Sequence, residues 1–154
     1  MNINALRNRP DIANDVKLSG LYVQFEQLLK ELNAKQLTPI AIDSINKDVE
    51  EINASTYAGN ELRKLVKQKQ TAILKLVENE FKFAPKNYYR NLWMILGFTA
   101  FGLPIGMLFG LSMKNMGLMG IGLPIGMAIG AVVGTSMDKK TLNEGRQLDL
   151  EIKY

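Results

Sequence analysis

Residues 91–137 read NLWMILGFTAFGLPIGMLFGLSMKNMGLMGIGLPIGMAIGAVVGTSM and contain a single charged residue, Lys114. A helix needs about 20 consecutive apolar residues to cross a bilayer core of about 30 Å. Residues 91–113 and 117–137 each satisfy that length, and residues 114–116 suit a tight turn. The segment therefore predicts a hairpin of two transmembrane helices.

The residues that flank this segment predict how it lies in a membrane. Aromatic rings prefer the headgroup level, and basic residues prefer the cytoplasmic side. Because only Lys114 stands in the turn, we expect both termini in the cytoplasm and the hairpin in the cell (inner) membrane. The basic flanks are Lys82, Lys86 and Arg90 before the first span and Lys139, Lys140 and Arg146 after the second, and the expected interface anchors are Tyr88, Tyr89 and Trp93.

Both spans carry the hexapeptide GLPIGM, at residues 102–107 and 122–127. Glycines spaced four apart lie on one face of a helix and allow another helix to approach closely, which is what holds helices together in lipid. Each proline removes one backbone hydrogen bond, so Pro104 and Pro124 are expected to be packing kinks or, alternatively, hinges. The expected helix-packing stripe comprises Gly102, Gly106, Gly110, Gly122, Gly126, Gly130 and Gly134.

These stripes resemble the glycine-zipper family of small two-span bacterial membrane proteins, over roughly residues 97–134. The resemblance implies hairpins that pack into oligomers, and it specifies no activity. In outline the hairpin is also similar to the rotor-ring subunit of an ATP synthase. Neither span contains Asp or Glu, however, so we do not expect proton-driven rotation.

Residues 1–84 are expected to form a cytoplasmic helical region. Apolar residues at helical spacing predict amphipathic helices over about 16–34, 40–53 and 60–82, with Thr38 as a cap before Pro39. They predict a helical bundle, or a coiled coil completed by neighbouring subunits. Residues 85–90 would be a juxtamembrane elbow. In the cytoplasmic tail, 138–154, the alternation of LDLEIKY favours a short strand or an extended arm. The fold class expected is all-α.

Composition excludes several kinds of chemistry. The chain has no Cys and no His, so thiol catalysis, imidazole acid–base catalysis and the usual zinc sites are absent. The net charge of +4 is spread along 154 residues, which does not favour nucleic acid as a partner. We expect no enzymatic activity, no cofactor and no metal.

Two functions remain open on the sequence. One is an oligomeric membrane scaffold or accessory subunit, whose hairpins pack through glycine stripes and whose cytoplasmic helices bind other copies or another membrane or cytoplasmic protein. The alternative is a pore-forming or membrane-perturbing channel gated by the N-terminal helices. The scaffold is favoured, because a pore lined by apolar side chains tends to dewet.

Overall fold

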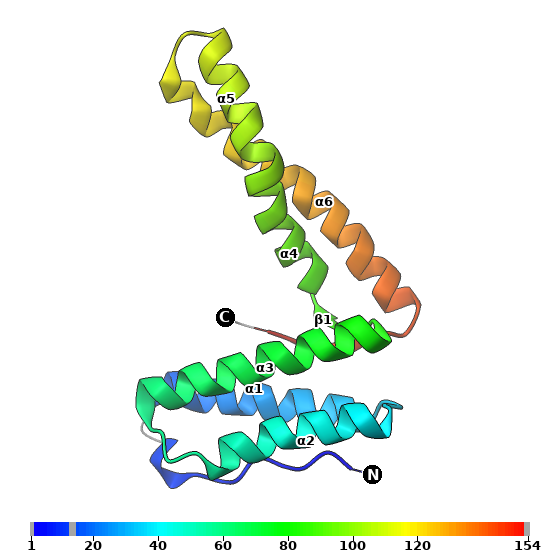
Figure 1. The fold of residues 1–154 in the computed structure, drawn as a ribbon. Coiled ribbons are helices and arrows are strands. Elements are labelled where there is room, and N and C mark those ends of the chain that lie inside the picture. The colour runs from blue at the N-terminus through cyan, green and yellow to red at the C-terminus, as the bar shows by residue number, and fades with distance from the viewer. Residues whose placement is uncertain (1, 13–14, 153–154) are drawn as a thin grey trace. The chain divides into compact units, whose positions relative to one another are not determined.

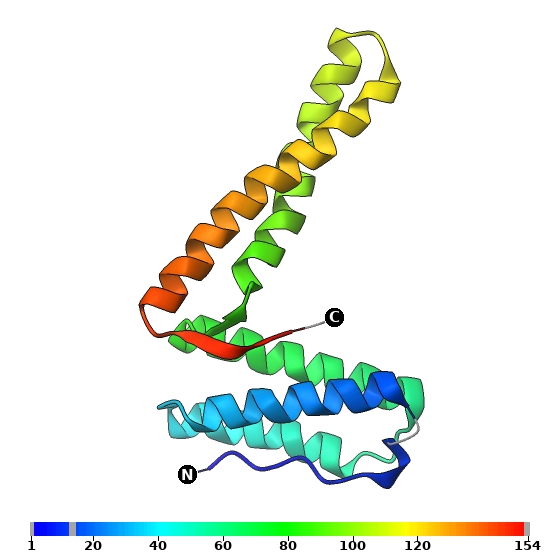
Figure 2. The same ribbon diagram turned by 180° about the vertical axis from the view of Figure 1, so that it is seen from behind.

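The computed structural model describes residues 2–12 and 15–152 and is mostly helical (Figures 1 and 2). It consists of two compact units. The first, which we call the bundle, contains the residues up to Ala84 together with Leu148–Ile152. The second, which we call the hairpin, is Pro85–Gln147. Lys153 and Tyr154, the last residues of the predicted tail, lie outside the described residues.

The bundle contains the three predicted helices, α1 (Val16–Asn33), α2 (Pro39–Ala54) and α3 (Gly59–Phe81). The first two begin at side-chain caps, which satisfy N–H groups left free at a helix start. The Asp15 carboxylate accepts from the backbone N–H groups of Lys17 and Leu18, and the Thr38 hydroxyl oxygen accepts from that of Ala41. The predicted cap before Pro39 is thus confirmed.

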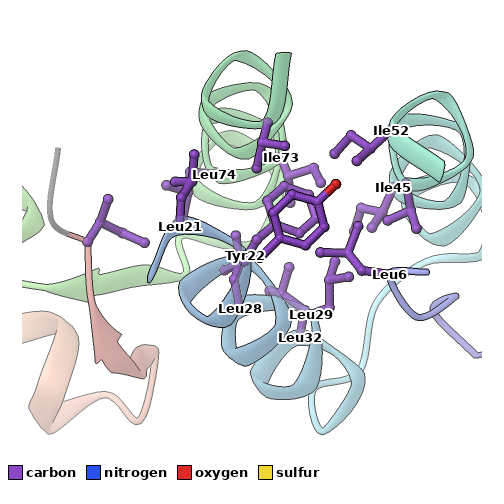
Figure 3. Close-up of a cluster of buried hydrophobic side chains, with 14 of the residues drawn as sticks. Leu6, Leu21, Tyr22, Leu28, Leu29, Leu32, Ile45, Ile52, Ile73 and Leu74 are labelled. Atoms are coloured by element: carbon purple, nitrogen blue, oxygen red, sulfur yellow. The ribbon is translucent and has the colours of Figure 1, made fainter. Parts of the chain in front are cut away.

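The apolar faces of the three helices meet in one core (Figure 3). Its central side chains are completely buried, and the hydrophobic effect favours that burial. The predicted apolar faces are therefore covered within one chain, as in a bundle, and need no neighbouring subunit. Side chains with 0% exposure include Phe25, Leu28, Leu32, Ile45, Val49, Ile52, Leu62, Val66, Ile73 and Val77.

Leu148–Ile152 complete this core. Strand β2 (Gln147–Glu151) pairs with strand β1 (Ala84–Lys86), so the chain is not purely helical. Leu148 and Leu150 alternate into the core with Ile152 beyond them, as the pattern of the tail predicted. The tail is thus divided, because residues up to Asn143 continue the last helix and 148–152 belong to the bundle.

Side chains of α1 hold β2 by its backbone. The Gln27 amide donates to the carbonyl of Asp149 at 3.1 Å, and the Asp149 N–H donates to the Glu31 carboxylate at 3.0 Å. Gln27 and Glu31 are one helical turn apart, so they project from the same face of α1. The tail therefore docks through its backbone as well as through its apolar side chains.

Ion pairs join the helices at the rim of the bundle. Arg63 of α3 binds Asp15 at 2.9 Å, and Lys69 of α3 binds Asp48 at 3.0 Å and also Glu51. The backbone N–H of Leu18, aided by Arg63, lowers the pKa of Asp15. Hydrogen bonding to Glu51 and Asp48 raises the pKa of Lys69. The lowered pKa of Asp15 and the raised pKa of Lys69 both favour the charged form of the group.

The hairpin has two legs that cross each other in both views (Figures 1 and 2). The first leg, Tyr88–Ser112, is made of α4 (Tyr88–Gly97), a π-helical segment η2 (Phe98–Gly102) and α5 (Leu103–Ser112). The second, Met116–Asn143, is made of a 3-10 segment η3 (Met116–Ile121) and α6 (Gly122–Asn143). The turn contains Lys114, which has a positive φ of 49°. The predicted spans agree with these legs except that α6 continues six residues further.

Candidate functional site

Every buried residue between Asn91 and Met137 is a glycine. The set contains all seven glycines of the predicted stripe and Gly97, whereas Gly117 and Gly120, nearer the turn, are not buried. Because glycine has no side chain, the two legs meet along their backbones. The buried glycines are 97, 102, 106, 110, 122, 126, 130 and 134.

The four glycines of α6 contact the first leg in antiparallel order. A Cβ atom added at any of them would lie under 3.0 Å from backbone atoms of the other leg, a separation that real Cβ atoms essentially never show. The sequence analysis expected the stripes to pack hairpin against hairpin in an oligomer, whereas in the structure these contacts join two legs of one chain. The nearest partners are Gly106 and Gly102 for Gly122, Gly102 and Gly97 for Gly126, Trp93 and Met94 for Gly130, and Tyr89 and Arg90 for Gly134.

The repeated hexapeptide lies at the middle of this contact. Gly122, from the second copy, sits against both Gly102 and Gly106 of the first copy. Gly126, also from the second copy, sits against Gly102. The repeat therefore places glycines of one copy against glycines of the other, which gives a physical reason for two identical sequences in facing antiparallel segments.

The large apolar side chains of the hairpin point outward. Ile95, Leu108, Leu111 and Val132 are each more than 60% exposed. Both legs are long and apolar enough to cross a membrane, and only 22% and 17% of their most apolar stretches are buried. A core helix of a soluble protein would bury most of that surface.

The two prolines lie next to changes of helix type. Pro104 is the second residue of α5, directly after the π-helical segment, and Pro124 is the third residue of α6, after the 3-10 segment. Proline has no N–H, so the usual α-helical bond to the carbonyl four residues earlier cannot form. A change of hydrogen-bond register beside each proline accommodates this loss. That either proline acts as a hinge stays a prediction.

The three predicted aromatic anchors have different surroundings. Tyr89 is buried at 7% exposure, whereas Tyr88 and Trp93 are half-buried. The rings of Tyr88 and Tyr89 pack edge to face, with centroids 5.2 Å apart. Tyr88 and Trp93 thus have more ring surface available for lipid headgroups, and the anchor role of all three stays a prediction.

Asp138 is a residue whose role the sequence analysis did not identify. It is 9% exposed, and its carboxylate accepts from the backbone N–H groups of Tyr89 and Arg90, both at 3.0 Å. A carboxylate is favourable at a helix N-terminus, because it bonds free N–H groups and complements the helix dipole. Asn87, which stands at the N-cap position of α4, makes no side-chain cap hydrogen bond. Asp138 therefore fastens α6 to the start of α4.

A sequence signal for this role exists, although it is weak. Asp138 continues the four-residue spacing of Gly126, Gly130 and Gly134, so it lies on the helix face that contacts the first leg. An acidic residue on a close-packed face needs donors from the facing helix. The position of those donors became known only when the two legs were placed together.

The described residues hold no group of three or more acidic, His or Cys side chains that could bind a metal. Two hydroxyls inside the legs, those of Thr99 and Ser136, bond to their own helices. Thr99 donates to the carbonyls of Ile95 and Leu96, and Ser136 donates to that of Val132. These bonds are the common way for a hydroxyl to be satisfied in a helix.

Comparison of the chain with protein-family models, curated proteins and solved structures found no match. Functional inference therefore rests on the residues and their geometry. The features available for it are the glycine contact, the apolar exterior of the hairpin and the bundle, to which both residues before Ala84 and Leu148–Ile152 contribute.

Proposed function

We propose that this protein is an integral membrane scaffold or accessory subunit, anchored by its hairpin in a bacterial inner membrane with both termini in the cytoplasm. The bundle would bind other copies of the chain or a partner protein. The observation that supports the anchor best is the distribution of side chains between Asn91 and Met137, where only glycine is buried and the large apolar groups face outward. In water such a surface would aggregate, whereas in lipid it is favourable.

The glycine contact fits the glycine-zipper type of packing. Helices in lipid gain little from burying apolar side chains against each other, so close backbone approach and van der Waals contact hold them together. The hairpin would be a preassembled anchor, and oligomers would form through surfaces other than its buried glycines. The scaffold is preferred to a pore, because the Thr99 and Ser136 hydroxyls are engaged within their own helices.

Topology is tested with single cysteines, which the absence of native Cys makes straightforward. Cys would replace Asn60, Asn115 or Asn143, all of which are exposed. In intact cells a membrane-impermeant thiol reagent should label only position 115, while all three positions should react after lysis. Extraction by alkaline carbonate, without detergent, would contradict the anchor. Labelling at position 60 from outside would contradict the cytoplasmic assignment.

A further measurement separates the scaffold from the pore. Purified protein in lipid vesicles should cause no leakage of an entrapped dye, and native mass spectrometry should give a discrete oligomer or a fixed complex. Leakage that scales with protein concentration would favour the pore instead.

A further inference from the structure

The bundle holds an extended segment of its own chain, residues 2–9, which we call the arm. Two amide side chains of α2, Asn46 and Asn53, bind the backbone of the arm. Each accepts one hydrogen bond and donates another. The four bonds join Asn46 to the N–H of Asn4 (2.7 Å) and the carbonyl of Asn2 (3.3 Å), and Asn53 to the N–H of Arg7 (2.7 Å) and the carbonyl of Ala5 (3.1 Å).

The spacing of the two amides matches an extended chain. Asn46 and Asn53 are seven residues apart, which is about 10.5 Å along a helix at about 1.5 Å per residue. The arm groups that they bind recur after three residues, which is about 10 Å in an extended backbone. One helix face can therefore bind successive three-residue units of a peptide. It binds them through the backbone N–H and C=O groups, and only proline lacks the N–H.

Side chains of the arm follow the same period of three. Leu6 is 7% exposed and points into the core cluster beside Leu29 and Ile45 (Figure 3), and Ile3 is half-buried. Arg9 donates to the carbonyls of Ser55 and Tyr57, beyond the end of α2. The arm thus has apolar contacts at positions 3 and 6 and a guanidinium contact at position 9.

The arm packs less completely against α1. A cavity of about 300 Å³ lies between residues 3–6 of the arm and the α1 residues Glu26, Leu29, Lys30 and Asn33. A second, of about 210 Å³, is lined by residues 7–9 and 12 and by Ser19, Tyr22, Val23 and Glu26. On the α1 side the arm still has two contacts, a hydrogen bond from the Ile3 N–H to the Asn33 side-chain oxygen at 3.2 Å and the packing of Leu6 beside Leu29, and the cavities leave the rest of that side unfilled.

We propose that this groove between α1 and α2 is a peptide-binding site for the arm of a second copy of the chain, and that the arm bound in the same chain is its closed form. The inference rests on the proposed membrane scaffold and identifies the surface through which its copies join. Exchange of the arm keeps every hydrogen bond and the buried Leu6, so the two forms have the same contacts. Anchoring in one bilayer would hold the bundles at high local concentration, which favours binding between copies.

The first experiment measures binding of a labelled peptide of residues 2–10 to the full chain and to a chain lacking residues 2–9, both in detergent micelles. The shortened chain should bind the peptide at least tenfold more tightly, because its groove is open. Asn46→Ala with Asn53→Ala in the shortened chain should weaken binding at least tenfold, and a peptide with Leu6→Asp should not bind. Asn143→Ala, an exposed substitution on the hairpin, is the matched control and should change nothing.

The second experiment measures oligomer size by native mass spectrometry. The full chain should form oligomers, and both the deletion and the double Asn variant should reduce them to monomers while the protein still requires detergent for extraction. Oligomers that survive both changes, or a monomeric full chain whose groove binds the peptide, would overturn exchange between copies. If the unaltered chain could be extracted from membranes without detergent, that result would contradict the membrane anchor. It would not contradict the binding of the arm in the groove.

A third measurement covers the case in which the shortened chain does not fold. Hydrogen exchange of the full chain should show the amides of Asn4 and Arg7 exchanging faster than that of Phe25 in the core. In the double Asn variant those two amides should exchange at least tenfold faster still, with Phe25 unchanged. If all three exchange together through global unfolding, the arm does not detach and the proposal fails.

Discussion

The bundle and the hairpin both bring helices together, but they bury opposite kinds of residue. In the bundle the buried positions are large, such as Phe25 and Ile73, and water drives their contact. Between Asn91 and Met137 the buried positions are all glycine, and the large side chains are outside. All but four of the exposed large hydrophobic residues of the described chain belong to the hairpin; the four are Val16, Val23, Ile40 and Tyr57.

This difference teaches how the surrounding medium selects a packing mode. A bundle in water is stabilised by the volume of its core side chains, so a loss of volume should be costly. A hairpin that meets along its backbones is stabilised by close approach, so a gain of volume should be costly. The five predictions that follow test this contrast, beginning with the largest expected effect.

The largest effect is expected from Gly126→Leu in the hairpin. Its new side chain would meet the backbone of Gly97 and Gly102, so the legs must separate, at a cost of more than about 3 kcal/mol. Two spin labels at exposed positions, one on each leg, should report a longer distance, and helicity should be lost at lower dodecyl sulfate concentration. Met127→Leu, one residue along and more than a third exposed, is the control and should change stability by less than about 0.5 kcal/mol. If Met127→Leu disrupted the hairpin while Gly126→Leu had no effect, the glycine contact would be misassigned.

The second effect concerns the bundle, where removing volume should matter. Leu148→Ala takes a side chain with 0% exposure out of the core and should destabilise the bundle by about 2–5 kcal/mol. Chemical denaturation followed by circular dichroism would measure the change. Asp149→Ala, at the exposed neighbouring position, is the control, because its backbone bonds to Gln27 and Glu31 survive.

The same reasoning applies to residues 1–84 as an isolated fragment. This fragment lacks the three buried apolar residues of the tail, so its core would be open to water or to another copy. Adding a peptide of residues 146–152 should raise its thermal midpoint. An unchanged midpoint would mean that the tail contributes little to the core.

A smaller effect is expected from Asp138→Ala, which removes a polar contact from the hairpin. The N–H groups of Tyr89 and Arg90 would lose their acceptor, and the loss of a helix cap costs about 0.5–2 kcal/mol. Dodecyl sulfate titration would detect it as a shift in the same direction as Gly126→Leu but smaller. Lys139→Ala, at an exposed position one residue along, should leave the titration unchanged.

The smallest effect should have the opposite sign. Gly20 lies in α1 with nothing within 4 Å of an added Cβ, so Gly20→Ala meets no obstacle. Alanine has the higher helix propensity, and the bundle should gain up to about 1 kcal/mol in denaturation. Gly130→Ala, at the glycine contact, should instead lose stability, because its Cβ would overlap the carbonyl of Trp93. Equal responses at the two glycines would remove the distinction between bundle and hairpin.

The sequence by itself determined the elements of this protein. The three amphipathic helices and the alternating tail follow from local periodicity, and the two legs follow from the length of their apolar runs. Each was placed to within a few residues except the end of α6. Periodicity is visible in a sequence because it reflects which face of one element is apolar, whatever lies opposite.

Only the tertiary structure decided which faces meet. Leu148 and Leu150 enter the core of a bundle that begins more than a hundred residues earlier, the glycine stripes contact each other within one chain, and Asp138 caps a helix 49 residues away. Asn46 and Asn53 each follow a buried isoleucine on α2, and their seven-residue spacing was visible, but the arm that they bind was not. Such contacts depend on chain segments far apart in sequence, and a local pattern carries no information about its partner until the backbone brings the two together.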